Sequence, residues 1–311
     1  MTTQARATQW RAFTQSLRDW LSKHEEPISG YLFLMPTLLS IFVFVVFPVL
    51  FSFYLSFHDW DYLSDTRPFL GLENYVRMFQ TERFWTTLKN TARYGFSIVP
   101  LNLVVALGLA LLVNNRVRGI NLFRTAYFSP VVTSSVAVAM IWGWIFDPGF
   151  GLLNYLLRLV GISPILWLGD PKWAVPSLVI MAVWNGVGYN MMIFLAGLQG
   201  VPQEYYDAAT VDGANSLKQF WHVTLPLLSP TTFFVVITGM IGALQVFDQI
   251  FILTKGGPAG STRTIVYYLW EHGFEYWDMG YASAVAYVLF AVIFALTQIN
   301  WRVGSRFVHY Q

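Results

Sequence analysis

A small set of neutral polar side chains stands inside long apolar stretches of this sequence. In one stretch Trp184, Asn185 and Tyr189 bring together an indole, an amide and a phenol, and residues 185 and 189 would share a helix face. Gln245 and Gln249 lie one helical turn apart at the end of a later stretch. Amides and aromatic rings suit ligands rich in hydroxyl groups, because they offer directional hydrogen bonds and a flat apolar face. We predict that these five side chains line a substrate pathway. The alternative, that the amides hydrogen-bond between packed helices, stays open.

The composition places these side chains in a membrane protein. The chain is 55% hydrophobic and 12% charged, whereas soluble globular domains carry about 25% charged residues. No polar segment is long enough to form a soluble catalytic domain of its own. The net charge of +2 gives no reason to expect a nucleic-acid partner, and the absence of cysteine excludes thiol nucleophiles and cysteine-ligated metals.

Six charge-poor runs are each longer than the about 20 residues that cross a bilayer as a helix. Prolines inside them are tolerated in membranes, where neighbouring helices satisfy the freed backbone groups. We therefore predict an all-α integral membrane protein with about six transmembrane helices in a domain 28–301, followed by a short tail 302–311. The expected spans are 28–57, 94–115, 125–146, 173–203, 223–247 and 279–301.

Charge placement predicts the orientation of these spans. The short turn 115–124 holds three arginines, and short loops rich in Lys and Arg stay in the cytoplasm. Both termini and the loop 201–222 are therefore expected in the cytoplasm. Residues 1–27 alternate apolar and basic positions at helical spacing, which favours an amphipathic helix on the inner membrane surface. A poorly ordered tail is the alternative for that segment.

The chain lacks the residues that several other functions need. No ionisable side chain occupies the centre of an expected span, whereas ion-coupled carriers commonly place such groups there. There is no GxxxxGK[ST] phosphate loop, and the five histidines show no HExxH spacing. Glu271 and Glu275 are four residues apart, but we expect them on a solvated helix face. We predict no catalytic residue, no metal site and no ATP site. The rival classes are a secondary, ion-coupled carrier and a membrane-embedded enzyme.

A long polar interruption between the fourth and fifth runs keeps helical signals throughout. Glu204 and Asp207 put negative charge in the first turns of a helix, where the helix dipole favours it. Gly213 can end that helix, and Asn215 or Ser216 can cap a second one. Two short helices hinged at a glycine predict a compact knob that docks into a partner.

The segment DAATVDGA in this knob resembles the EAA loop of permeases from binding-protein-dependent ABC importers. Asp207 stands where that family usually has glutamate, which keeps the charge but shortens its reach. The chain is similar to the sugar-permease branch, including the maltose, glycerol-phosphate and multiple-sugar permeases, in order from about Gly30 to Trp301. Further similar segments are FLGLENY at 69–75, RTAYFSPVV at 124–132, FDPGFGLLN at 146–154, FDQIFILTKGGP at 247–258 and MGYASA at 279–284.

The resemblance implies a type I ABC importer permease fold in the inner, cytoplasmic membrane. It implies transport of a carbohydrate or related polyol by alternating access, together with a second homologous permease, two ATP-binding subunits and an extracytoplasmic solute-binding protein. ATP and Mg²⁺ would be bound by the ATPase partner, so no cofactor is expected in this chain. The residues that it implies for ATPase coupling are Glu204, Asp207, Ala208, Ala209, Asp212, Gly213 and Ala214.

Overall fold

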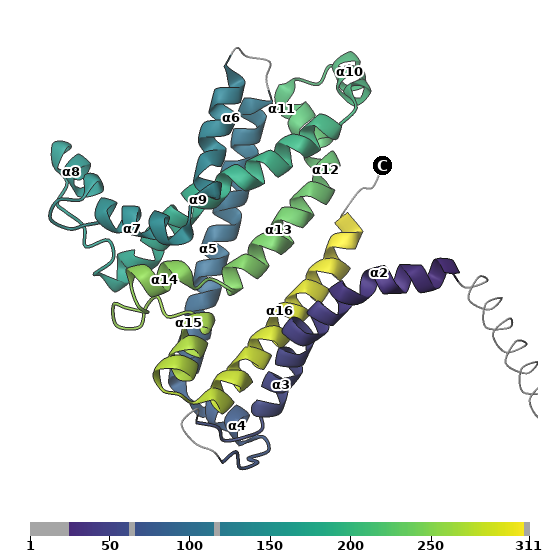
Figure 1. The fold of residues 1–311 in the computed structure, drawn as a ribbon. Coiled ribbons are helices and arrows are strands. Elements are labelled where there is room, and N and C mark those ends of the chain that lie inside the picture. The colour runs from purple at the N-terminus through teal and green to yellow at the C-terminus, as the bar shows by residue number, and fades with distance from the viewer. Residues whose placement is uncertain (1–24, 62–65, 115–118, 308–311) are drawn as a thin grey trace, which may run out of the picture. The chain divides into compact units, whose positions relative to one another are not determined.

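The computed structural model describes residues 25–61, 66–114 and 119–307, and regular secondary structure in these ranges is helical (Figure 1). The chain divides into two units, Met1–Leu55 and Ser56–Gln311. Almost all of the predicted amphipathic segment 1–27 lies outside the described residues, as do the arginines at 116 and 118 that favoured the predicted orientation.

The described part of the first unit is one helical rod. It comprises α2 (Glu25–Ile41), a π-helical turn η1 (Phe42–Val46) and α3 (Phe47–Leu55). Ser29–Leu55 is long and apolar enough to cross a membrane, as predicted for the first span. Most of its large hydrophobic side chains are exposed within this chain, which is the distribution expected of a helix that meets lipid or other helices.

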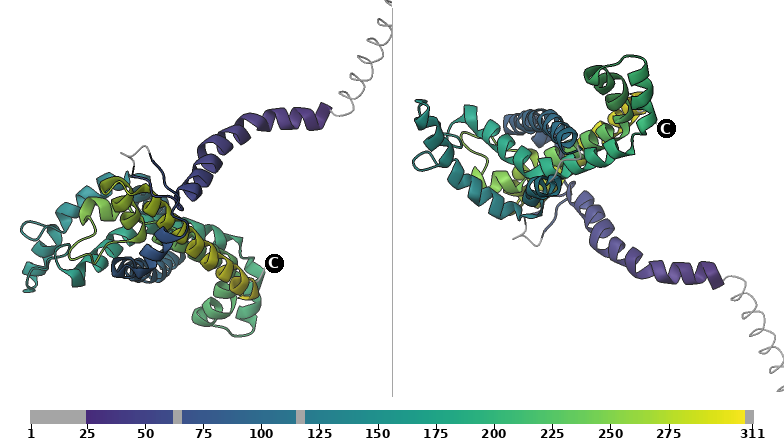
Figure 2. Two further views of the ribbon diagram at one scale, coloured as in Figure 1. Left: turned by 90° about the horizontal axis from the view of Figure 1, so that it is seen from below. Right: turned by 90° about the horizontal axis from the view of Figure 1, so that it is seen from above.

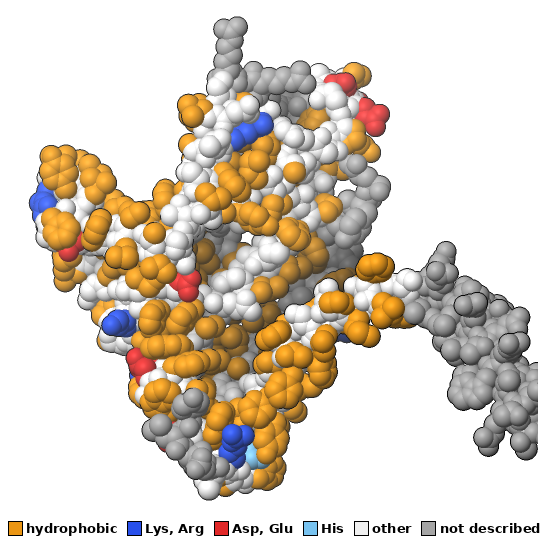
Figure 3. Space-filling model, viewed as in Figure 1, with side chains coloured by type: hydrophobic (Ala, Val, Ile, Leu, Met, Phe, Trp, Pro, Cys, Tyr) orange, Lys and Arg blue, Asp and Glu red, His pale blue; other side chains and the backbone are white. Residues whose placement is uncertain are grey.

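Four long helices form the bundle of the second unit: α5 (Glu82–Val113), α9 (Pro171–Gly200), α13 (Ser229–Leu244) and α16 (Met279–Phe307) (Figures 1 and 2). The most extensive contact joins α5 to α9. Small residues such as Ala106 and Ala110 allow this close approach, and Phe194 fills the space between the helices. On the face shown in Figure 3 hydrophobic side chains predominate and charged ones are few.

Close backbone approach is clearest at Gly188. A Cβ atom at this position of α9 would lie 2.0 Å from the carbonyl oxygen of Tyr127, at the end of α6 (Ile120–Phe128). Only glycine fits there, so this residue sets the separation of α9 and α6.

The third expected span is not one straight helix. It consists of α6, a 3₁₀ turn η2 (Ser129–Val132) and α7 (Ser135–Ile145), and the two halves are bent by 101°. Pro130 has no N–H to continue the helix, and the hydroxyl of Ser129 donates to the carbonyl oxygen of Ala126 instead, at 3.1 Å. The sequence predicted one span over 125–146 with Pro130 inside it, and the structure forms this span as a bent pair of helices that begins at Ile120. Five helices in the described residues could each span a membrane, or six if the bent pair counts as one.

Two other helix boundaries differ from the prediction. α5 begins at Glu82 and not at Tyr94, because its first turns are held by packing in which Phe84 and Thr87 are buried. The fifth span breaks after Leu244, and α14 (Asp248–Leu253) restarts the helix after three residues in other conformations.

The bundle has two distinct ends (Figure 1). One, here called the α10 end, carries the short helices α10 (Gln203–Val211), α11 (Ser216–Gln219), η3 (Phe220–Thr224) and α12 (Leu225–Leu227). The other, the α4 end, carries α4 (Glu73–Gln80), α15 (Ile265–Trp270) and the π-helical turn η4 (Glu271–Glu275). α8 (Leu152–Leu159) extends beside α7.

At the α4 end, the structure corrects the expectation that Glu271 is solvated. Glu271 is buried, and Arg83 of α5 donates to its Oε1 at 3.0 Å. Arg263 approaches from the other side, with Nη2 donating to Oε1 at 3.2 Å and Nε 3.1 Å from Oε2. A buried carboxylate needs such partners, because desolvation would otherwise disfavour its charge. Glu275 is exposed, as expected.

The neighbouring His272 lies among aromatic rings. The Tyr268 and Tyr281 rings have centroids 4.5 Å from that of the histidine, and Tyr276 approaches at 5.2 Å. Burial in this setting lowers the pKa of His272 to about 4, because the charged imidazolium loses solvation. The imidazole is therefore neutral at physiological pH.

Candidate functional site

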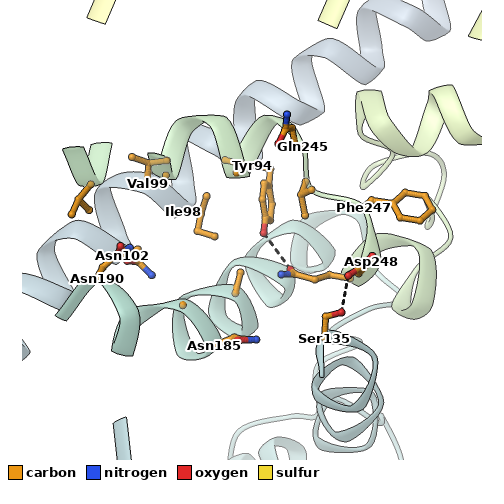
Figure 4. A pocket seen from close by; sticks show the side chains of 18 residues that line it. Tyr94, Ile98, Val99, Asn102, Ser135, Asn185, Asn190, Gln245, Phe247 and Asp248 are labelled. Atoms are coloured by element: carbon orange, nitrogen blue, oxygen red, sulfur yellow. Dashed lines mark hydrogen bonds between the residues drawn. The ribbon is translucent and has the colours of Figure 1, made fainter. Parts of the chain in front are cut away.

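A cavity of about 430 Å³ lies between α5, α9 and the broken fifth span, and we call it the polar cavity (Figure 4). Several of its lining residues carry amides or hydroxyl groups, and glycines of α13 widen it. The polar side chains of its lining are Tyr94 and Asn102 from α5, Ser135 from α7, Asn185 and Asn190 from α9, and Gln245, Asp248 and Gln249 from the region of the break.

Three hydrogen bonds organise the wall of the polar cavity. The Tyr94 hydroxyl donates to Gln249 Oε1 at 3.2 Å. Asn190 Nδ2 donates to Asn102 Oδ1 at 2.6 Å, which joins α9 to α5. Ser135 Oγ donates to Asp248 Oδ2 at 2.6 Å. These groups thus spend part of their hydrogen-bonding capacity on each other.

The structure brings together three of the five residues proposed for the pathway. Asn185, Gln245 and Gln249 all line the polar cavity, although they come from two separate spans. Within the described part of the chain, the side chains of Asn185 and Gln245 make no hydrogen bond and so keep donors and acceptors for a ligand. Because these amides make no hydrogen bond within the described chain, they can bind hydroxyl groups of a ligand without first breaking a protein contact.

Trp184 and Tyr189 lie outside this lining. Trp184 packs edge-to-face on Trp142 with ring centroids 5.7 Å apart and is 44% exposed. Tyr189 is 50% exposed on the surface of α9. Their role in a pathway stays a prediction that requires a second protein surface opposite α9.

Sequence reasoning missed Tyr94, Asn102 and Ser135. Tyr94 and Asn102 are eight residues apart on one face of α5, a spacing that was visible in the sequence. Tyr94 escaped notice because the span was expected to begin there. Ser135 could not be found this way, because it reaches the cavity only through the bend between η2 and α7.

The charge of the polar cavity comes from one residue. Among the described residues that line it, Asp248 is the only one with an ionisable acid or base other than the phenol of Tyr94. The carboxylate lies beside the first residue of α7, where the helix dipole favours negative charge. The cavity therefore offers a neutral ligand many hydrogen bonds but offers an anion no cationic partner. No group of three or more potential metal ligands occurs in the described residues.

The loop 201–222 forms two short helices, as predicted. Gly213 has a φ of +77°, a left-handed conformation that favours glycine, and it follows the end of α10. The Asn215 side chain caps α11 by accepting from the N–H of Lys218 at 2.9 Å. Gln219 Nε2 donates to Thr210 Oγ1 at 2.9 Å and holds the two helices together.

Most of the residues that the resemblance implied for coupling lie on the surface of this loop. Ala209 and Ala214 are half-buried and joined by a backbone hydrogen bond of 2.9 Å. Val211, 88% exposed, and Leu217 are large apolar side chains beside them that the sequence analysis did not single out. The exposed ones among the residues implied for coupling are Glu204, Asp207, Ala208, Asp212 and Gly213.

The structure combines membrane-length helices, a polar cavity and a surface loop of two short helices, an arrangement that suits a membrane transport subunit. Comparisons with known proteins identify the family. Residues 102–301 match the family described as "Binding-protein-dependent transport system inner membrane component". The probable ABC transporter permease protein YesP of Bacillus subtilis is 38% identical over 295 residues, covering 93% of this chain and 94% of that protein. The trehalose/maltose transport system permease protein MalF of Thermococcus litoralis is 34% identical, covering 91% and 95%.

The fold agrees with these relatives. A bacterial ABC transporter involved in the import of the acidic polysaccharide alginate contains a chain that superposes with a TM-score of 0.81, at 23% identity, covering 96% of this chain and 100% of that chain. This chain belongs to the family of binding-protein-dependent transport system inner membrane components and has the type I ABC importer permease fold.

Proposed function

We propose that this chain is the transmembrane permease subunit of an ATP-driven importer that moves a carbohydrate or related polyol by alternating access. The observation that carries the proposal is the polar cavity, which offers unpaired amides at Asn185 and Gln245 inside a membrane-length bundle. Relatives named as transport permeases for trehalose/maltose and for arabinooligosaccharides are 34% and 36% identical to it. The absence of a cation from the described lining favours a neutral substrate.

The proposed assembly contains a second homologous permease, two copies of an ATP-binding subunit and an extracytoplasmic solute-binding protein. ATP and Mg²⁺ are bound by the ATPase, and this chain makes and breaks no covalent bond. The loop 201–222 docks into the ATPase, with Glu204, Asp207, Ala208 and Asp212 on its exposed face. The α10 end and both termini lie in the cytoplasm, and the α4 end faces outward.

The substrate passes between the two permeases. Asn185, Gln245 and Gln249 contact it from the cavity wall, and the exposed rings of Trp184 and Tyr189 face the second permease. An exposed tyrosine and tryptophan on this surface suit a partner interface, where such side chains are enriched.

Two rivals make different demands. A secondary carrier would need ionisable groups that bind the driving ion, and Asp248 is the one carboxylate in the described cavity lining. A membrane-embedded enzyme would need reactive side chains in a cleft. The burial of Glu271 against two arginines removes the most suggestive carboxylate from such a role.

Uptake of radiolabelled sugars by cells expressing the complete transporter tests the proposal, with candidates chosen by ligand screening of the cognate binding protein. Uptake should persist when the membrane potential is collapsed while ATP is maintained. It should stop when the ATPase subunit carries an inactivating substitution. Uptake that stops when the membrane potential is collapsed, and that is unchanged by the inactivating ATPase substitution, would establish the secondary carrier instead.

A further inference from the structure

Two of the membrane-length elements in the described residues are interrupted, and both interruptions lie at the polar cavity. Thr133 and Ser134 have extended backbones between η2 and α7. The second interruption separates Leu244 of α13 from Asp248 of α14. Ser135 and Asp248, the first residues after each break, both line the cavity. Half-helices that meet at a binding cavity are elements that can move during transport.

The two half-helices after the breaks, α7 and α14, contact each other at both ends. At the cavity, Ser135 Oγ donates to Asp248 Oδ2 at 2.6 Å (Figure 4). At the other end, a Cβ at Gly143 would lie 3.3 Å from Leu253 Cδ2, so the helices touch there. Leu253 also packs against the buried cluster that contains Trp142.

The two contacts between α7 and α14 differ in kind: one is polar and the other is apolar. Both residues of the polar contact, Ser135 and Asp248, are exposed, so solvent screens the carboxylate and the bond contributes about as much as one ordinary hydrogen bond. The contact of Gly143 with Leu253 is apolar and carries no hydrogen bond. In the described residues, the bond between Ser135 and Asp248 is the one hydrogen bond that joins α7 to α14.

Chain connectivity links this pair to the ATPase-coupling loop. η3 begins within the loop 201–222, and α12 follows it and leads into α13, which ends at the break before Asp248. Tyr206 of α10 and Thr224 of η3 are joined by a hydrogen bond of 3.1 Å, which ties the loop to this path. The path from the loop to α14 therefore runs along α13 and through the three residues of the break.

We propose that Ser135 and Asp248 form a positioning pair that makes α7 and α14 move as one body, so that motion of the fifth span also moves the bent third span. This inference rests on the proposed function as an ATP-driven importer. The pair itself does not bind ATP. Its loss lowers the amount of substrate moved per ATP hydrolysed and leaves the rate of hydrolysis unchanged.

Single substitutions in the complete transporter test the pair. Ser135→Ala and Asp248→Ala should each lower the amount of substrate moved per ATP hydrolysed by about fivefold, the factor that one ordinary hydrogen bond represents. Asp248→Asn keeps an acceptor oxygen and should retain most of the coupling. The matched control is Ser134→Ala, because this neighbouring hydroxyl makes no hydrogen bond in the described part of the chain. Equal coupling in Ser135→Ala and Ser134→Ala would overturn the proposal.

A crosslink distinguishes a permanent tie from a gate that opens. The chain has no cysteine, so Ser135→Cys with Asp248→Cys introduces the only thiols of this subunit. The reduced double variant should be poorly coupled, a short bifunctional thiosulfonate should restore coupling, and a reductant should abolish it again. A crosslinked transporter that hydrolyses ATP but moves no substrate would show that the pair must separate.

A measurement without substrate separates this inference from the proposed function. The crosslinking yield should be the same in nucleotide-free and vanadate-trapped complexes if α7 and α14 move together. A yield that falls in one state overturns the pair even where uptake is normal. Failure of sugar uptake with an unchanged yield would count against the proposed substrate class alone.

Discussion

Side chains of the polar cavity differ in how much of their hydrogen-bonding capacity is already used. Asn102 and Asn190 bond to each other, and Tyr94 donates to Gln249. Asn185 has no such bond in the described residues although it lies in the same wall. An amide without a protein partner is stable in a membrane-length bundle where water or a ligand reaches it.

This difference predicts the behaviour of a cysteine at position 185. Asn185→Cys should react with a water-soluble thiol reagent, and a trapped nucleotide state should change the rate. Phe96→Cys is the control, because Phe96 is 79% exposed on the apolar flank of α5 and should meet lipid. Lack of reaction at position 185 in every state, with Asn185→Ala losing expression and not transport, would make Asn185 a packing residue.

A second prediction concerns Glu271. Glu271→Gln removes the charge that faces Arg83 and Arg263, so the variant should lose about 3 kcal/mol of stability. Thermal unfolding of the purified complex measures this loss. Glu275→Gln is the matched control, because Glu275 is exposed four residues away. Equal unfolding temperatures for the two variants would contradict a stabilising role for the buried ion pairs.

For single helices and loops, sequence features that depend on adjacent residues predicted the structure correctly. Features that depend on residues far apart in the sequence were not predicted. Gly213 and Asn215 revealed the two helices of the loop 201–222, because a left-handed turn and a helix cap depend on a few adjacent residues. The 101° bend after Pro130 was not predicted, because proline inside a membrane helix often gives only a kink. The burial of Glu271 depends on Arg83, which is 188 residues away in sequence.

The left-handed turn at Gly213 in the loop 201–222 gives a testable prediction about ATPase coupling. In the variant Gly213→Pro, residue 213 cannot adopt a φ of +77°, because the proline ring fixes φ near −65°. The variant should insert in the membrane but lose stimulation of the ATPase by loaded binding protein. Gly119→Pro is the matched control, since Gly119 has a φ of +85° in another turn at the α10 end. Equal loss of stimulation in both variants would show a general folding defect and not a coupling role.

For the complete chain, the membrane-length helices could be predicted from the sequence, whereas their packing could not. Charge-free runs reveal membrane-length helices because the bilayer excludes charged groups, whatever the fold. How the helices pack depends on contacts such as that between Gly188 and Tyr127, which no periodicity reveals. The polar cavity is a product of that packing, since its lining comes from five separate helices and the break before α14.

The proposed orientation is tested by labelling with a membrane-impermeant thiol reagent. Glu275→Cys at the α4 end should react in intact cells. Asn121→Cys at the α10 end should react only after the membrane is permeabilised, because this end is expected in the cytoplasm. Both residues are exposed, so accessibility within the chain is matched. The reverse pattern would invert the proposed orientation.

The ion pairs around Glu271 can form only late in synthesis of the chain. Arg83 leaves the ribosome 188 residues before Glu271, which at about 5 to 20 residues per second is a wait of about 10 to 40 s. During that time Arg83 lacks the carboxylate that it meets in the finished chain. A chain that stops short of Glu271 keeps Arg83 and Arg263 without the carboxylate that joins them, so the contact between α5 and η4 forms only after residue 271 is made.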